Sequence, residues 1–256
     1  MQTDFIQAFK KKAREKNVLG FFSKTTDSSL IEASGFSGMD FVILDMEHGP
    51  ITTETLKHHL MACKSSGILS VVRVDAWDSE LIGKALDLGA NGIQVPSVDH
   101  VDQAVAIVNQ MKFHPEGKRG VCRFVRAADY ANMNRFDYFS DANQNLVVVQ
   151  LEGVNGVNAF DAIINVPGID IVFIGPYDLS QSIGFPGQID HPEVIKTIEL
   201  LNQKAAARNV LLGTFCDTPE NLQKWANLGL NYLAYSVDIA LFTEQLKSID
   251  KHRKEA

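Results

Sequence analysis

Acidic side chains follow two successive apolar runs of the sequence, at the points where these runs end. Glu152 comes directly after the run 146–151, and Asp178 follows the run 171–174 through a Gly-Pro-Tyr turn. Apolar, β-branched runs of this length are typical of buried parallel strands, whose carboxyl ends face the ligand site of α/β proteins. Two carboxylates at one such edge suit a divalent cation with oxygen ligands. For either residue considered alone, capping of the following helix is an equally good explanation.

A third apolar run, 41–44, ends in a cluster that holds both acids and an imidazole. Asp45, Glu47 and His48 stand directly before a Gly-Pro turn. An imidazole oriented by carboxylates exchanges protons near neutral pH, which is the chemistry of a general acid or base. An exposed loop in which these residues are neighbours by chance is the alternative, and the position at a strand end favours a site.

Arg73 stands at the end of an otherwise apolar run that begins at Leu69. Burying a guanidinium is costly unless it meets an anion. Two partners remain open at this point: a carboxylate or enolate of a substrate, or a structural salt bridge with Asp45 or Glu47.

Apolar runs alternate with helical patterns along the chain, which positions these residues at one end of a barrel. The predicted strands are 18–22, 41–44, 69–74, 92–95, 146–151, 171–174, 210–213 and 232–235. The predicted helices are 3–15, 28–33, 53–64, 79–88, 101–111, 157–163, 192–208, 219–228 and 240–248. The alternation favours a single-domain (β/α)8 TIM barrel over residues 1–256, with an extra N-terminal helix, over a doubly wound sheet. Residues 112–145 interrupt the pattern and are expected to be irregular.

Composition narrows the class of protein. The 256 residues carry a formal net charge of −7, with 45% hydrophobic and 21% charged residues, as in an ordinary globular domain. The acidic balance argues against a nucleic-acid surface, and no apolar stretch approaches the roughly 20 residues that span a bilayer. Three cysteines without metal-type spacing indicate reduced thiols. We therefore expect a soluble, cytoplasmic chain that binds neither nucleic acid nor membrane.

Several other features carry weaker signals. The loop 117–123 resembles an anion-binding loop only superficially and is interpreted as a rim or subunit contact. Residues 242–256 are available to dock on a neighbouring subunit. The remaining histidines are interpreted as solvent-facing; they are His58, His59, His100, His114, His191 and His252.

Taken in order, these motifs resemble the HpcH/HpaI aldolase family, the metal-dependent (class II) pyruvate aldolases. The resemblance extends over roughly residues 18–242. The segments that carry it are LDMEHGP at 44–50, VVRV at 71–74, DLGA at 87–90 through VP at 95–96, RGV at 119–121, QLE at 150–152 and FIGPYDLS at 173–180. Agreement in order and spacing across these segments makes chance similarity a poor explanation.

The resemblance implies roles for individual residues. Glu152 and Asp178 match the two protein ligands of a divalent ion such as Mg2+, Mn2+ or Co2+. His48 matches the acid/base residue, with Asp45 as its orienting partner, and Arg73 matches the residue that contacts the pyruvate-derived oxygen. The implied substrate-binding set is completed by Gln150 beside the metal, the backbone of Gly175, Pro176 and Tyr177 up to Asp178, and the apolar Phe215.

The resemblance also implies a reaction and partners. The reaction is the reversible cleavage of a 4-hydroxy-2-oxo acid to pyruvate and an aldehyde, through a pyruvate enolate that the metal stabilises, in the catabolism of aromatic compounds or sugar acids. A homo-oligomer, a hexamer or a smaller ring such as a trimer with shared active sites, is implied as well. A citrate-lyase-β-like lyase acting on a hydroxyacyl-CoA and a non-catalytic oxo-acid-binding barrel are the alternatives.

The chain departs from the family pattern at two places. Cys122-Arg123 replaces small residues, and Asp75-Ala76-Trp77 replaces a turn that contains proline. Both departures are expected near the mouth of the barrel, so the identity of the aldehyde stays open.

Overall fold

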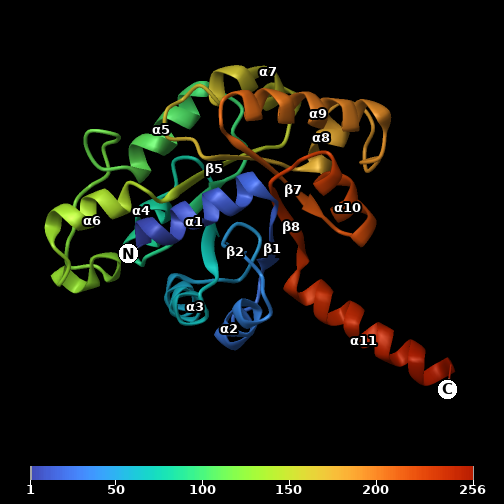
Figure 1. Cartoon of the computed structure of the whole chain (residues 1–256), viewed down its shortest axis with the longest axis horizontal. Coiled ribbons are helices and arrows are strands. Elements are labelled where there is room, and N and C mark those ends of the chain that lie inside the picture. The colour runs from blue at the N-terminus through green and yellow to red at the C-terminus, as the bar shows by residue number, and fades with distance from the viewer. Residues whose placement is uncertain (1, 256) are drawn as a thin grey trace.

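The computed structural model describes residues 2–255 and contains a closed barrel of eight parallel strands (Figure 1). Each strand pairs with its neighbours in sequence, and β8 closes the ring by pairing with β1. The strands are β1 (Val18–Ser23), β2 (Phe41–Asp45), β3 (Leu69–Arg73), β4 (Gly92–Val95), β5 (Leu146–Leu151), β6 (Ile171–Ile174), β7 (Leu211–Cys216) and β8 (Tyr232–Val237). The predicted TIM barrel with an N-terminal helix is confirmed.

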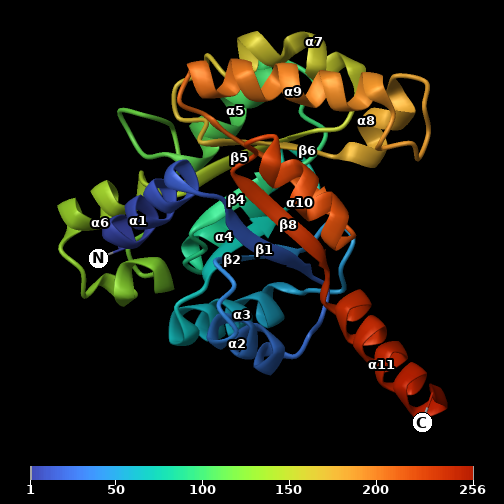
Figure 2. The same ribbon diagram turned by 45° about the vertical axis from the view of Figure 1, so that its right-hand side comes forward.

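Helices alternate with the strands and surround the barrel (Figures 1 and 2). They are α1 (Gln2–Glu15), α2 (Ser28–Phe36), α3 (Thr53–Ser66), α4 (Leu81–Asp87), α5 (Val101–Met111), the 3-10 helix η1 (Arg126–Ala131), α6 (Arg135–Ala142), α7 (Val154–Ile163), α8 (Pro176–Ser182), α9 (Pro192–Ala207), α10 (Pro219–Asn227) and α11 (Asp238–Glu255). The prediction missed η1, α6 and α8. These three are short, and their sequences lack the long apolar periodicity from which the other helices were predicted.

Local sequence explains where the helices begin and end. Thr52 and Thr218 accept hydrogen bonds from backbone N–H groups in the first turns of α3 and α10, at 3.2 and 3.1 Å. Proline occupies the first turn of α8, α9 and α10, where its missing N–H is not needed. Gly67 ends α3 with a φ of 73°, in the left-handed region that glycine adopts without strain.

The core is divided between the inside and the outside of the barrel. An outer layer packs the outward-facing strand residues against the surrounding helices. The inner cluster joins residues near the strand starts, such as Phe41 and Tyr232, to Ile6, Phe9 and Ala13 of α1. The rings of Phe41 and Tyr232 stack with their centroids 3.9 Å apart. Helix α1 therefore closes the amino end of the barrel and leaves the carboxyl end for a site.

The segment that was predicted to be irregular, 112–145, lies beside α1 and includes η1 and α6. Asp141 and Asn145 accept hydrogen bonds from Thr3 and Gln2 at the start of α1. Arg119 is buried and pairs with Asp87 at 2.6 Å. The segment therefore belongs to the amino end of the barrel, and the expectation that Cys122-Arg123 lies near the mouth is wrong for this chain's own barrel.

Helix α11 leaves the barrel instead of packing along it, and both views show it projecting away from the body (Figures 1 and 2). None of its residues is buried, and Ile239, Phe242, Leu246 and Ile249 are between 50% and 66% exposed. Within residues 2–255, none of the helices combines the length and hydropathy needed to cross a bilayer.

Candidate active site

Arg73 and Asp45 form a buried ion pair at the carboxyl end of the barrel. Asp45 ends β2, Arg73 ends β3, and the two are direct partners in the pairing of these strands. The Nε and Nη2 atoms of Arg73 donate to the two carboxylate oxygens at 3.0 and 2.8 Å. Asp45 is fully buried and Arg73 is 8% exposed, so little water screens the pair. Of the partners left open for Arg73, the structural salt bridge is present.

Asp45 also fixes the backbone of the turn that follows β2. Its Oδ1 atom accepts hydrogen bonds from the backbone N–H groups of Glu47 and His48 at 3.2 and 3.1 Å. Burial acts to raise the pKa of Asp45, but the hydrogen bonds and charge of Arg73 outweigh it, and the pKa is lowered from its ordinary value. Asp45 is therefore held as a carboxylate.

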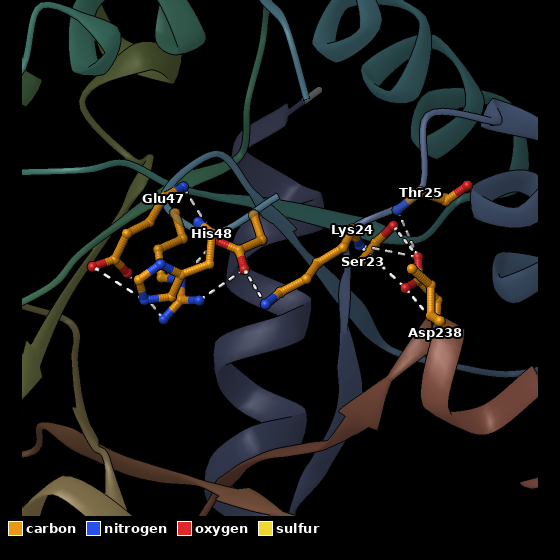
Figure 3. Close-up of polar contacts among 9 residues, drawn as sticks. Ser23, Lys24, Thr25, Glu47, His48 and Asp238 are labelled. Carbon is orange, nitrogen blue, oxygen red and sulfur yellow. Dashed lines mark hydrogen bonds and ion pairs between the residues drawn. The ribbon is translucent and has the colours of Figure 1, made fainter. Parts of the chain in front are cut away.

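Glu47, and not Asp45, approaches the imidazole of His48 (Figure 3). An Oε1–Nε2 distance of 3.7 Å separates Glu47 from His48, and the other oxygen of Glu47 lies 3.1 Å from Nη1 of Arg73. Asp45 reaches His48 only through the backbone, so the assignment of Asp45 as partner of the imidazole is corrected to Glu47. Burial raises the pKa of Glu47, opposed in part by the charges of Arg73 and His48. The side chain of His48 is 61% exposed at the mouth.

Glu152 and Asp178 come together around Gly175. A Cβ atom added at Gly175 would lie 2.9 Å from Oδ2 of Asp178 and 3.7 Å from Cγ of Glu152. The carboxylate of Asp178 and the side-chain stem of Glu152 therefore border one point, which a side chain at residue 175 would fill. Gly175 donates its backbone N–H to Leu151 at 3.1 Å, which keeps the ends of β5 and β6 side by side.

Neutral side chains hold Glu152 on both of its oxygens. Gln150 donates to Oε1 and Ser97 donates to Oε2, each at 2.5 Å. Buried Gln94 in turn donates to the amide oxygen of Gln150 at 2.6 Å. This relay from β4 to β5 fixes the orientation of the Glu152 carboxylate and leaves its charge uncompensated.

A cavity of about 150 Å³ opens at this end of the barrel. Arg73, Gln150 and Asp178 contribute its polar lining together with Lys24, and its remaining lining residues are Phe22, Phe173, Gly175, Pro176, Tyr177, Phe215 and Val237. The predicted substrate-binding residues therefore share one cavity, whereas His48 and Glu152 stand beside it. The hydroxyl of Tyr177 donates to Asp217, which raises the pKa of Tyr177 to about 12.

The acidic pair fits a hard divalent cation. Among residues 2–255, neither Glu152 nor Asp178 forms an ion pair with a basic side chain, and both side chains lie beside Gly175. Carboxylate oxygens are the ligands that Mg2+ and Mn2+ prefer. Over the same range, no group of three or more His, Cys, Asp or Glu side chains is arranged for a metal. Two protein ligands would leave the remaining positions to water and substrate.

Two contacts of the site were missed by sequence analysis. Lys24 follows β1, and Gln94 lies in β4. Each stands at or near the carboxyl end of a predicted strand, which is the signal that could have selected them. The prediction that His59 faces solvent is wrong: it is fully buried, and burial lowers its pKa.

A parallel (β/α)8 barrel with acids, an arginine and an imidazole at the carboxyl ends of its strands is the architecture of an enzyme. The family model HpcH/HpaI aldolase/citrate lyase matches residues 18–244. The 2-keto-3-deoxy-L-rhamnonate aldolase of Salmonella gallinarum is 37% identical over 243 residues, which cover 94% of this chain and 90% of the relative. The chain therefore belongs to the HpcH/HpaI aldolase/citrate lyase family, and it is a class II pyruvate aldolase, a carbon–carbon lyase.

Solved structures agree with this family and vary in activity. An HpcH/HpaI aldolase/citrate lyase family protein from Burkholderia cenocepacia superposes with a TM-score of 0.88 at 29% identity, covering 96% of this chain and 99% of that one. The citrate synthase SbnG superposes with a TM-score of 0.83 at 30% identity, covering 94% of both chains. Family membership alone therefore does not name the substrate.

The buried pair gives stability a defined pH dependence. Asp45→Asn should lower the free energy of unfolding by about 3 kcal/mol at pH 7, because removing one partner leaves a buried guanidinium underpaired. Because the pKa of Asp45 is depressed in the folded state, its contribution is complete above the ordinary value of 3.8 and is lost as pH falls below it. Urea denaturation at pH 7, 4 and 3 measures the difference between wild type and variant.

The difference should shrink towards pH 3. Asp102→Asn, at an exposed acid in the first turn of α5, is the control and should change the free energy of unfolding by less than about 1 kcal/mol. An Asp45→Asn effect that stays constant from pH 7 to pH 3 would contradict this assignment.

Proposed function

We propose that the protein cleaves a 4-hydroxy-2-oxo acid of the 2-keto-3-deoxy sugar-acid type to pyruvate and an aldehyde, and catalyses the reverse condensation. The observation that carries the proposal is the convergence of Glu152 and Asp178 around Gly175, in reach of the cavity that Arg73 lines. The activity named for the 37% identical relative supports the substrate type. The three cysteines are free thiols, which supports a cytoplasmic location.

Glu152 and Asp178 would hold a divalent ion, and the aldolases of this family are metal-dependent. When bound, such an ion supplies Lewis-acid stabilisation of negative charge on a carbonyl oxygen. Gln150 and Ser97 keep the Glu152 carboxylate in one orientation for that purpose.

Arg73 would stabilise the negative charge that develops when the carbon–carbon bond breaks. Its guanidinium is already fixed by Asp45 and Glu47, so no reorganisation is needed at the moment of reaction. The backbone from Gly175 to Tyr177 would bind the substrate carboxylate. Phe215 would border the pyruvyl methyl group and, with the neighbouring aromatic rings of the cavity, exclude water.

His48 would take the proton from the 4-hydroxyl group as the bond breaks. Its backbone is held by Asp45, and Glu47 stands close enough to stabilise the imidazolium that results. A binding protein without catalysis has no use for a proton acceptor beside a fixed cation, which supports the lyase over a non-catalytic barrel. A hydroxyacyl-CoA lyase differs in substrate, and direct assay with such a thioester separates the two.

We further propose that the protein is a homo-oligomer held together by α11. The apolar residues of α11 recur at intervals of three and four, which places Ile239, Phe242, Leu246 and Ile249 along one stripe. Exposed apolar stripes of this kind mark protein contacts. In a second copy of the chain, the stripe could contact Leu30 and Phe36, which are exposed on α2. Helix α2 follows β1, the strand that pairs with β8. In a closed ring such as a hexamer or trimer, the α11 helix of each subunit would be covered by a neighbouring subunit.

Removal of the metal should abolish cleavage. Dialysis against EDTA should reduce pyruvate release to background, and Mg2+, Mn2+ or Co2+ should restore it, because the acids alone offer no positive charge to the developing enolate. Pyruvate release is measured with lactate dehydrogenase, and bound metal by elemental analysis. Glu152→Gln should lose both metal and activity. Full turnover in excess EDTA would contradict the metal assignment.

Substitution of the two residues assigned to charge and proton transfer should separate their roles. Arg73→Ala should lower kcat by on the order of 10²–10³, as the loss of one charge-stabilising donor does. His48→Ala should lower kcat by roughly 10²–10⁴ while bound metal stays at the wild-type level. His58→Ala, at an exposed histidine of α3, is the control. Loss of metal in His48→Ala would instead make His48 a ligand.

Charging the stripe of α11 should dissociate the oligomer. The double variant Phe242→Asp/Leu246→Asp should shift the mass measured by light scattering after gel filtration to that of the monomer, because a carboxylate is costly in an apolar contact. Val105→Asp/Leu200→Asp charges two exposed apolar residues of α5 and α9 and should leave the mass unchanged. A wild-type protein that is already monomeric at assay concentration would refute the proposal.

A further inference from the structure

Lys24 contributes a cation to the active-site cavity that the proposed chemistry does not use. It directly follows β1, lines the cavity with Arg73 and Asp178, and its side chain is 30% exposed. Its Nζ atom forms a loose ion pair with Asp45, and Figure 3 shows its side chain extending towards Glu47 and His48. The Nζ–Oδ2 distance is 3.6 Å, which is longer than a hydrogen bond.

Asp45 does not require Lys24 as a partner. Both of its oxygens already accept from Arg73, and Oδ1 accepts two further backbone N–H groups. Within residues 2–255, the ammonium of Lys24 makes no hydrogen bond beyond this loose ion pair. An ammonium carries three donors on a flexible stem, so Lys24 keeps donors free for a ligand in the cavity.

The backbone at Lys24 is held in place from two sides. Asp238, the first residue of α11, accepts from the hydroxyl of Ser23 at 2.7 Å and from the backbone N–H groups of Lys24 and Thr25 at 3.1 and 3.0 Å (Figure 3). The Nε2 atom of buried His59 lies 2.9 Å from the carbonyl oxygen of Thr25. The turn is therefore already ordered before a ligand binds, so binding loses little conformational entropy there, as in a preorganised site.

The position of Lys24 determines which part of a substrate it meets. In the ring of eight strands, β1 lies opposite β5, and Glu152 and Asp178 follow β5 and β6. A substrate whose 2-oxo acid end is held by these acids and the turn at Gly175 extends its other end across the cavity towards β1. An anion that met Lys24 would therefore be carried by the aldehyde half and not by the pyruvate half.

We propose that Lys24 is a specificity-determining residue that selects substrates whose aldehyde half carries a carboxylate. The inference rests on the proposed aldol reaction and deepens it: the substrate is a 4-hydroxy-2-oxo diacid, and the aldehyde is a semialdehyde acid. A charge-assisted hydrogen bond to that carboxylate stabilises the bound acid, and a neutral analogue cannot form it.

The test is condensation of pyruvate with aldehyde acids of two to four carbons, each compared with its neutral methyl ester. The wild type should prefer at least one acid over its ester in kcat/KM. Lys24→Met should lower that acid-to-ester ratio by about 10- to 100-fold, as expected for one hydrogen bond to a charged group. Lys24→Arg, which keeps the charge, should retain most of the preference. Lys84→Met, at an exposed lysine of α4, should leave the ratio unchanged.

Two outcomes would overturn the inference: a wild type that does not favour any acid over its ester, or a Lys24→Met variant with an unchanged ratio. Failure of the proposed function itself is recognised separately. Exchange of the methyl protons of pyruvate with solvent, followed by NMR on the metal-loaded wild type, reports enolate formation without any aldehyde. If the wild type exchanges these protons but Lys24→Met leaves the acid-to-ester ratio unchanged, the aldolase assignment is supported and the proposed role of Lys24 is wrong.

Discussion

The buried pair between Asp45 and Arg73 is the interaction on which the geometry of the site depends. It joins the ends of β2 and β3 and is shielded from water, so each charge needs the other. Asp45 also fixes the backbone of Glu47 and His48, and Arg73 fixes the carboxylate of Glu47. This one ion pair therefore fixes the guanidinium of Arg73 and the turn that carries the imidazole of His48. The acids that would hold the metal follow β5 and β6, and Glu152 is held by a separate set of neutral partners.

Much of this arrangement could be predicted from the sequence, because strand ends are visible in it. Apolar runs that stop at Asp45, Arg73, Glu152 and near Asp178 indicate both the strands and the edge at which these side chains gather. The resemblance across several motifs gave the family, which the family model and the 37% identical relative confirm. Periodicity located the long helices for the same reason, since each must cover an apolar face of the barrel.

What the sequence could not show is which partner each polar side chain selects. Asp45 and Glu47 are two residues apart and both pair with Arg73, and only the structure shows that Glu47 is the one that also approaches the imidazole. His59 lies on a helix surface by its spacing, yet it is buried because the turn at Thr25 folds over it. The segment 112–145 has no strong period, so its placement beside α1 depends on contacts far apart in the chain.

Closure of the amino end by α1 has a consequence for how substrate and products reach and leave the site. Because Ile6, Phe9 and Ala13 fill the floor of the barrel, the described part of the chain leaves its carboxyl end for traffic in both directions. The substrate and both products of the proposed cleavage would therefore share one opening, and each product would leave past the same lining residues, among them Lys24 and Tyr177.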